Sequence, residues 1–293
     1  MVVEPLTTDQ EPAVATGPAG QATGRRRAAL RSGLVIAGLG ILTVLPFYLW
    51  LYSLQSADQS AAAIGMSSMH MNRMGVFWSF PLLQASGLTA LIWAYLGVAL
   101  GLVQSGRNLR WLSLSKGQTD RLHRQISLLV IGLILVHAVA TAFDAMGDNL
   151  KTVFVPWQES WTAAVFAYNI GIFALYLALL LGPTYYLRSR LGPRAWRIAH
   201  RFVLVVYILA VWHTLIIGAD VEYYSWIRPF IWMMQVPLLA VFVWRLARPA
   251  RSMRQGWARA LRYSLTGIGA AAAIWITIIV ADGSYTSVVR SIQ

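Results

Sequence analysis

Four of the five histidines lie on two apolar stretches of the chain, at spacings that suggest metal chemistry. His123 and His137 are 14 residues apart, and His200 and His213 are 13 residues apart. At about 1.5 Å per residue, each step corresponds to about 20 Å along a helix. Ionisable residues at membrane depth are rare and usually functional, and imidazole nitrogens can occupy both axial positions of a haem iron. The pattern predicts two haem sites stacked across a membrane, an inner one on His123 and His200 and an outer one on His137 and His213.

Haem-free interpretations remain open for any single histidine. An intramembrane histidine can form a hydrogen bond between helices, and in a transporter it can bind a proton or a substrate. These alternatives explain neither the restriction to two stretches nor the matched depth. The 13-residue step also requires an irregularity, because at about 100° per residue it ends about 140° from its starting face. Either that span deviates from an ideal helix, or His200 lies in an irregular first turn after Gly192 and Pro193.

The composition identifies the elements that must position these histidines. Hydrophobic residues make up 57% of the 293 residues and charged residues only 12%, against about 25% charged in a soluble domain, which excludes a conventional soluble enzyme. Cysteine is absent, so thiolate-held clusters and covalently attached haem are excluded. We expect an all-α, polytopic helical membrane bundle with a six-helix haem-binding core and an extra C-terminal span. The seven predicted spans are 33–53, 77–104, 124–146, 161–186, 201–219, 227–246 and 264–281.

Basic residues predict the orientation. With a cytoplasmic N-terminus, 20 of the 24 Lys and Arg residues fall in inside segments, as the positive-inside rule requires. The net charge of +13 is then explained by topology and contact with anionic lipid, and nucleic-acid binding is not expected. Arginine outnumbers lysine 22 to 2, which favours a bacterial plasma (inner) membrane.

The chain divides into four predicted segments. Residues 1–24 form a disordered cytoplasmic tail, and 25–76 hold the first span and an outer loop. We interpret the first span as a retained anchor, with cleavage near 61–63 as the alternative. The predicted di-haem domain covers 77–246, and 247–293 hold a basic linker, the seventh span and a short outer tail.

Polar residues flank both predicted haem levels. Arg121, Arg124, Arg197 and Arg201 could bind haem propionates at the inner level, or act only as positive-inside residues. Beyond the outer level, Asp144, Asp148 and Asp220 form a candidate acceptor site that would attract a cation such as ferric ion, although they could also be solvated loop acids. The outer loop 66–74 contains Met66, Met69, His70, Met71 and Met74, which could bind Cu(I) or fill an amphipathic segment.

The two histidine motifs carry a family resemblance. RLHRQISLLVIGLILVHAVATAF around His123 and His137, and RAWRIAHRFVLVVYILAVWHTL around His200 and His213, resemble the third and fifth helices of the ferric reductase-like transmembrane domain. Ferric reductases, NADPH oxidases and the haem-binding membrane subunit of the bacterial periplasmic methionine-sulfoxide reductase system share that domain. The resemblance covers about residues 77–246 and implies two b-type haems that carry electrons from the cytoplasmic side to an outer acceptor.

This sequence departs from the family after the sixth span. Ferric reductases and NADPH oxidases usually continue into flavin- and nicotinamide-binding domains, whereas a basic linker and a seventh span follow here. The resemblance therefore implies an oxidoreductase component with a separate electron donor, either a cytoplasmic flavin reductase or membrane quinol. The acceptor would be an extracytoplasmic metal ion or redox protein. A quinol-oxidising cytochrome b and a haem-free transporter or scaffold are the alternatives.

Overall fold

The structure is a computed structural model of the whole chain, and it describes residues 18–65, 78–104, 115–143, 150–156, 162–218, 220–221, 224–247 and 256–283. Regular structure in these ranges is helical throughout, so the predicted all-α class is confirmed. The helices are α1 (Pro18–Gly65), α2 (Ser79–Gln104), α3 (Lys116–Ala142), α4 (Leu150–Phe154), α5 (Ala163–Leu181), α6 (Thr184–Leu191), α7 (Pro193–Arg201), α8 (Val203–Ile217), α10 (Ile227–Ala247), α11 (Gly256–Ile278) and the π-helix Ile279–Gly283.

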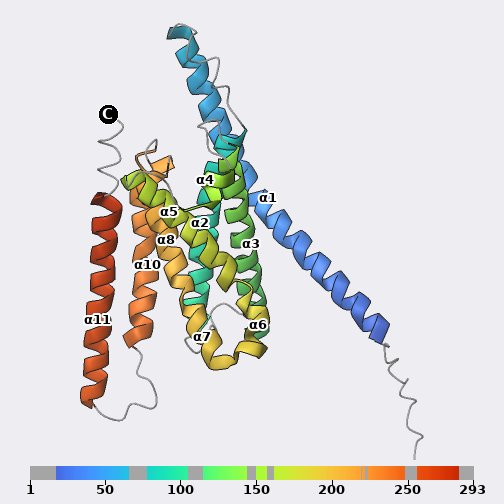
Figure 1. Cartoon of the computed structure of the whole chain (residues 1–293), viewed down its shortest axis with the longest axis vertical. Helices are drawn as coiled ribbons and strands as arrows, with labels where there is room; N and C mark the ends of the chain where they lie inside the picture. Colours follow the sequence, from blue (N-terminus) through green and yellow to red (C-terminus); the bar gives the residue numbers. More distant parts are fainter. Residues whose placement is uncertain are drawn as a thin grey trace, which may run out of the picture.

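Within the described residues, six stretches are long and apolar enough to cross a membrane. They are Ala29–Ser56, Ser79–Gln104, Lys116–Ala142, Ala163–Leu181, Pro193–Ile217 and Ile227–Arg245. The seventh predicted span corresponds to α11, whose apolar part, Tyr263–Ile278, is shorter. The seventh crossing therefore stays a prediction. The start of α1, helices α6 and α7, and the start of α11 all lie at one end of the bundle (Figure 1).

The central bundle consists of α2, α3, α5, α8 and α10. Buried side chains of α2, α8 and α10 form the largest apolar cluster, which includes Leu91, Val211 and Ile231. Helix α1 crosses the bundle obliquely (Figure 1). It packs on α2 and α3 through residues such as Ile36 and Leu39. Much of the remaining surface of α1 is apolar and exposed, as expected of a helix that faces lipid.

Capping and helix-breaking residues explain where the helices differ from the predicted ranges. Helix α3 begins eight residues before the predicted start, because Ser115 and Gln118 form a capping box at its N-terminus. Helix α5 ends at Leu181, ahead of Gly182 and Pro183. Helix α1 begins at Pro18, inside the segment 1–24 that we expected to be disordered, and residues 1–17 lie outside the described ranges.

The expected irregularity between His200 and His213 is present. Helix α7 ends at Arg201 and α8 begins at Val203, with Phe202 as the cap between them. The Phe202 N–H donates to the Ala199 carbonyl, three residues back, which tightens the last turn of α7. Ahead of α7, Gly192 has φ of 77°, a conformation that glycine adopts without strain. This break changes the face on which His200 lies, so that a 13-residue step can place both histidines toward α3.

Candidate functional site

The four histidines form two facing pairs, as the sequence predicts. The ring centroids of His123 and His200 are 5.9 Å apart, and those of His137 and His213 are 6.1 Å apart. One member of each pair comes from α3, and the other comes from α7 or α8. When two imidazoles bind one metal ion from opposite sides, their ring centroids lie about 6 Å apart. This distance is the sum of two metal–nitrogen bonds of about 2 Å and the distance from each nitrogen to the centre of its ring. Both pairs therefore have the separation that one metal ion between two rings requires.

Backbone carbonyls orient both rings of the outer pair. His137 Nδ1 lies 2.8 Å from the Leu83 carbonyl oxygen, and His213 Nδ1 lies 3.0 Å from the Ala167 carbonyl oxygen. A carbonyl oxygen only accepts, so each Nδ1 carries the proton and donates it. The lone pair is then on Nε2, as in histidines that ligate a metal through that atom.

Glycines on neighbouring helices leave room for three of the four rings. A Cβ at Gly87 would lie 2.9 Å from His137, one at Gly101 would lie 3.2 Å from His123, and one at Gly171 would lie 2.6 Å from His213. Gly87 and Gly101 on α2 are 14 residues apart, the same step that separates His123 and His137 on α3. Helices α2 and α3 run in opposite directions, so Gly87 lies level with His137 and Gly101 lies level with His123.

One large cavity connects the two histidine pairs. Its volume is about 1390 Å³, and residues of α2, α3, α5 and α8 line most of it, all four histidines included. Single small-molecule sites have volumes of roughly 300–1,000 Å³. No group of three or more His, Cys, Asp or Glu suited to a bare metal ion occurs among the described residues. Two imidazoles per level suit a porphyrin, which supplies the other four nitrogens of the iron.

The inner pair is held differently from the outer pair. The indole ring of Trp196 stacks on the His200 ring, with centroids 5.2 Å apart and planes 17° apart. Trp196 Nε1 is buried and makes no hydrogen bond within the protein. The indole N–H can only donate, so it is available to an acceptor bound in the cavity.

Cationic side chains surround the inner end of the cavity. Of the predicted propionate ligands, Arg124, Arg197 and Arg201 line it, whereas Arg121 is exposed and is not among the lining residues. The sequence interpretation missed three further cations that line the cavity, Lys116, Arg188 and Arg245. Among them, the Arg188 guanidinium lies 4.6 Å from the centroid of the Tyr185 ring, and Arg124 lies 5.7 Å from the same ring.

The candidate acceptor residues are only partly described. Asp144, Asp148 and the methionine-rich loop 66–74 lie outside the described residues. Asp220 lines the cavity and is only 5% exposed, and its Oδ1 has no hydrogen-bond partner. Burial raises the pKa of the Asp220 carboxyl to about 7, because the charged form loses its hydration. Asp220 is thus a buried acid and not the solvated loop acid that the alternative interpretation expected.

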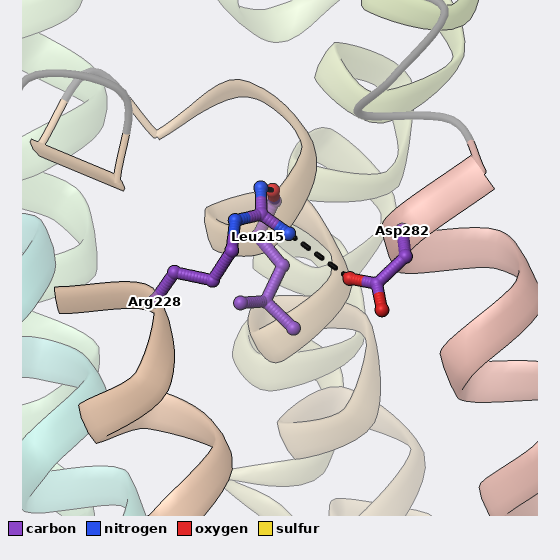
Figure 2. Close-up of polar contacts among 3 residues, drawn as sticks. All are labelled: Leu215, Arg228 and Asp282. Atoms are coloured by element: carbon purple, nitrogen blue, oxygen red, sulfur yellow. Dashed lines mark hydrogen bonds and ion pairs between the residues drawn. The ribbon is translucent and has the colours of Figure 1, made fainter. Parts of the chain in front are cut away.

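Arg228 connects the ends of three helical segments. Arg228 on α10 donates one hydrogen bond to the Leu215 carbonyl of α8 and forms a 3.1 Å ion pair with Asp282 of the π-helix that follows α11 (Figure 2). The Leu215 carbonyl is in the last turn of α8, where backbone acceptors lack partners within the helix. Arg228 therefore links the π-helix that follows α11 to the bundle at this end.

Comparison with known proteins shows a similarity over part of the chain. Residues 86–211 match the family described as ferric reductase like transmembrane component, whereas curated proteins and solved structures gave no match. The matched segment contains His123, His137 and His200, and His213 lies two residues beyond it. Transmembrane domains of this family generally bind haem, and the match indicates an electron-transfer role. The two facing histidine pairs thus lie in or next to a segment of this multi-pass membrane protein that is similar to the ferric reductase-like transmembrane component.

Proposed function

We propose that the protein is a transmembrane di-haem b electron-transfer component. His123 and His200 would hold the inner haem, and His137 and His213 the outer one. The observation that carries this proposal is the pair of ring separations, 5.9 and 6.1 Å, within one cavity. When bound, haem b supplies an iron that accepts and releases single electrons.

The chain's own residues would bind, orient and neutralise the two groups. The Leu83 and Ala167 carbonyls fix the outer imidazoles, and Trp196 fixes His200. Arg124, Arg197 and Arg201 would bind propionates at the inner end, where guanidinium and carboxylate form strong paired hydrogen bonds. Arg121, which is exposed, fits the positive-inside interpretation better.

The proposed direction is from the cytoplasm to the outside. The end of the bundle with α6 and α7 carries the arginine-rich segments, which the positive-inside rule assigns to the cytoplasm together with the N-terminus. We infer a bacterial plasma membrane, with a cytoplasmic flavin reductase or membrane quinol as donor. The outer acceptor would be a ferric ion or a redox protein, with Asp144, Asp148 and Asp220 as its candidate site.

Electron transfer across vesicle membranes tests this function. Proteoliposomes loaded with a membrane-impermeant reductant should reduce an impermeant ferric chelate outside. His213→Ala should lower the rate toward that of protein-free vesicles. Equal rates with and without wild-type protein would contradict the proposal. A colourless purified protein would instead favour a haem-free transporter or scaffold.

The identity of the acceptor requires a separate comparison. If the outer acids attract a metal cation, re-oxidation of the reduced protein by cationic ferric chelates should exceed re-oxidation by anionic ones, and added salt should reduce the difference. Asp144→Asn with Asp148→Asn should abolish the preference without changing the haem spectra. A rate independent of chelate charge would favour delivery to a redox protein. Quinol-driven reduction that requires an intact outer site would favour a quinol-oxidising cytochrome b.

A further inference from the structure

The outer end of the cavity contains a buried carboxyl group that no step of the proposed function uses as an acid. Asp220 follows His213 by seven residues and lines the same cavity as His137 and His213. It is one of few buried charged or polar side chains among the described residues, and its Oδ1 makes no hydrogen bond. A buried carboxylate with one oxygen left unpartnered is costly, and a proton or a ligand would compensate its charge.

We propose that Asp220 takes up one proton at its carboxylate when an electron arrives at the outer histidine pair, and releases that proton when the electron leaves. The inference rests on the proposed function, because it requires a redox group on His137 and His213. One electron and one proton enter together, so the net charge inside the outer half of the cavity stays constant. The proton comes from outer water and returns to it.

Burial explains why the electron and the proton would be coupled. Inside a low-dielectric cavity, charges interact much more strongly than in water and are little screened by salt. An added electron therefore raises the proton affinity of a nearby carboxylate. Because burial already brings the pKa of Asp220 to about 7, this change falls within the physiological pH range.

Among the described residues that line the outer part of the cavity, Asp220 is the acid. Helices α3 and α8 contribute His137 and His213, whose Nδ1 protons are committed to carbonyls. Helix α5 contributes Tyr168 and helix α2 contributes the uncharged Gln84 to the same cavity. The cation of α10 at this end, Arg228, is bound to Leu215 and Asp282 (Figure 2).

Asp220 lies near the predicted outer end of the fifth membrane-spanning stretch. It lies three residues beyond Ile217, the end of the fifth membrane-spanning stretch, and so close to the outer boundary of the membrane. Its own carbonyl accepts the Tyr224 N–H, which holds the backbone at this position. An acid held at this end of the cavity would exchange its proton with the outer solution in each reduction cycle.

Potentiometric titration of the purified full-length protein tests the proposal. The redox component of the outer haem is identified as the one that is missing in His213→Ala. Its midpoint potential should fall as pH rises between about 6 and 8, with a slope of up to about 59 mV per pH unit, the value of one tenfold change for a one-electron couple. In Asp220→Asn the potential should be independent of pH, equal to that of wild type at low pH and higher at high pH, where wild type carries the carboxylate charge.

Two controls separate the possible failures. Asp220→Glu should retain the slope, and Asp120→Asn, at the other carboxyl that lines the cavity, should leave the outer slope unchanged. A wild-type outer component with no slope, or an Asp220→Asn variant that retains it, would overturn the proposal while leaving the di-haem function intact. Absence of any outer haem band in wild type would instead overturn the proposed function. If Asp220→Asn fails to bind haem, the slopes of wild type and Asp220→Glu decide.

Discussion

The His213 ring lies against Gly171 so closely that a Cβ on Gly171 would come within 2.6 Å of the ring Nδ1. That nitrogen is also bound to the Ala167 carbonyl, on the same helix as Gly171. Helix α5 therefore both orients this imidazole and leaves the space that it occupies. The same relationship recurs between α2 and His137, through the Leu83 carbonyl and Gly87.

Substituting these glycines should weaken the haem sites in a graded order. Gly171→Ala should displace His213 and remove most of the outer haem, whereas Gly101→Ala, whose Cβ would lie 3.2 Å from His123, should have a smaller effect on the inner one. Gly132→Ala on α3, with nothing within 4 Å, is the matched control. Haem absorbance per chain measures the effect. A Gly171→Ala protein with the full outer spectrum would contradict the packing argument.

The histidines should fall into two functional pairs. We expect His137→Ala and His213→Ala to remove the same haem and to leave the other in place, because their rings face each other. His123→Ala and His200→Ala should remove the second haem. Low-temperature spectra of the four variants distinguish the two components. Loss of both haems with equal ease in each single variant would argue for a different pairing.

Trp196 should act on the inner site through its stack and its N–H group. Trp196→Phe keeps an aromatic ring against His200 but removes the buried donor, so the inner haem should stay bound with a shifted midpoint potential. Trp196→Leu removes both and should weaken inner haem binding by about 10–100-fold, the usual cost of losing a residue that orients a ligand. Trp212→Phe, at an indole outside the cavity lining, serves as the control. Unchanged inner potentials in both Trp196 variants would show that the stack only fills space.

The purified chain should not oxidise NADH or NADPH by itself. Its predicted inside segments between spans are no longer than about 20 residues, far below the roughly 50 that a nucleotide-binding domain needs. A flavin reductase or a quinol, once added, should reduce the haems, which stopped-flow absorbance would follow. Rapid haem reduction by NADPH and the pure protein alone would refute the need for a separate donor.

The sequence predicts the histidine pairing well because it depends on spacing and direction alone. His123 and His200 start two parallel spans, so the nearly equal steps of 14 and 13 residues place His137 and His213 level at the other end. The 13-residue step even predicts an irregular helix, found as the break at Phe202. The family resemblance is likewise confirmed by the match over residues 86–211.

Other parts of the site depend on contacts between helices, which one sequence does not reveal. Gly87 and Gly101 carry a readable signal, since they repeat the 14-residue step of the facing histidines. Trp196 and Arg245 have no such pattern, because they reach the cavity only through the positions of α7 and α10. The burial of Asp220 does not follow from the sequence either, since an acid just after Gly218 fits both an acceptor site and a solvated loop.

A haem count on the purified, full-length protein tests the central claim most directly. Protein extracted in mild detergent, assayed as the pyridine haemochrome and quantified against chain concentration, should contain two non-covalent b-type haems per chain. Its reduced-minus-oxidised spectrum should resolve two components. One haem per chain, or none, would contradict the assignment of His123 with His200 and His137 with His213 as two ligand pairs.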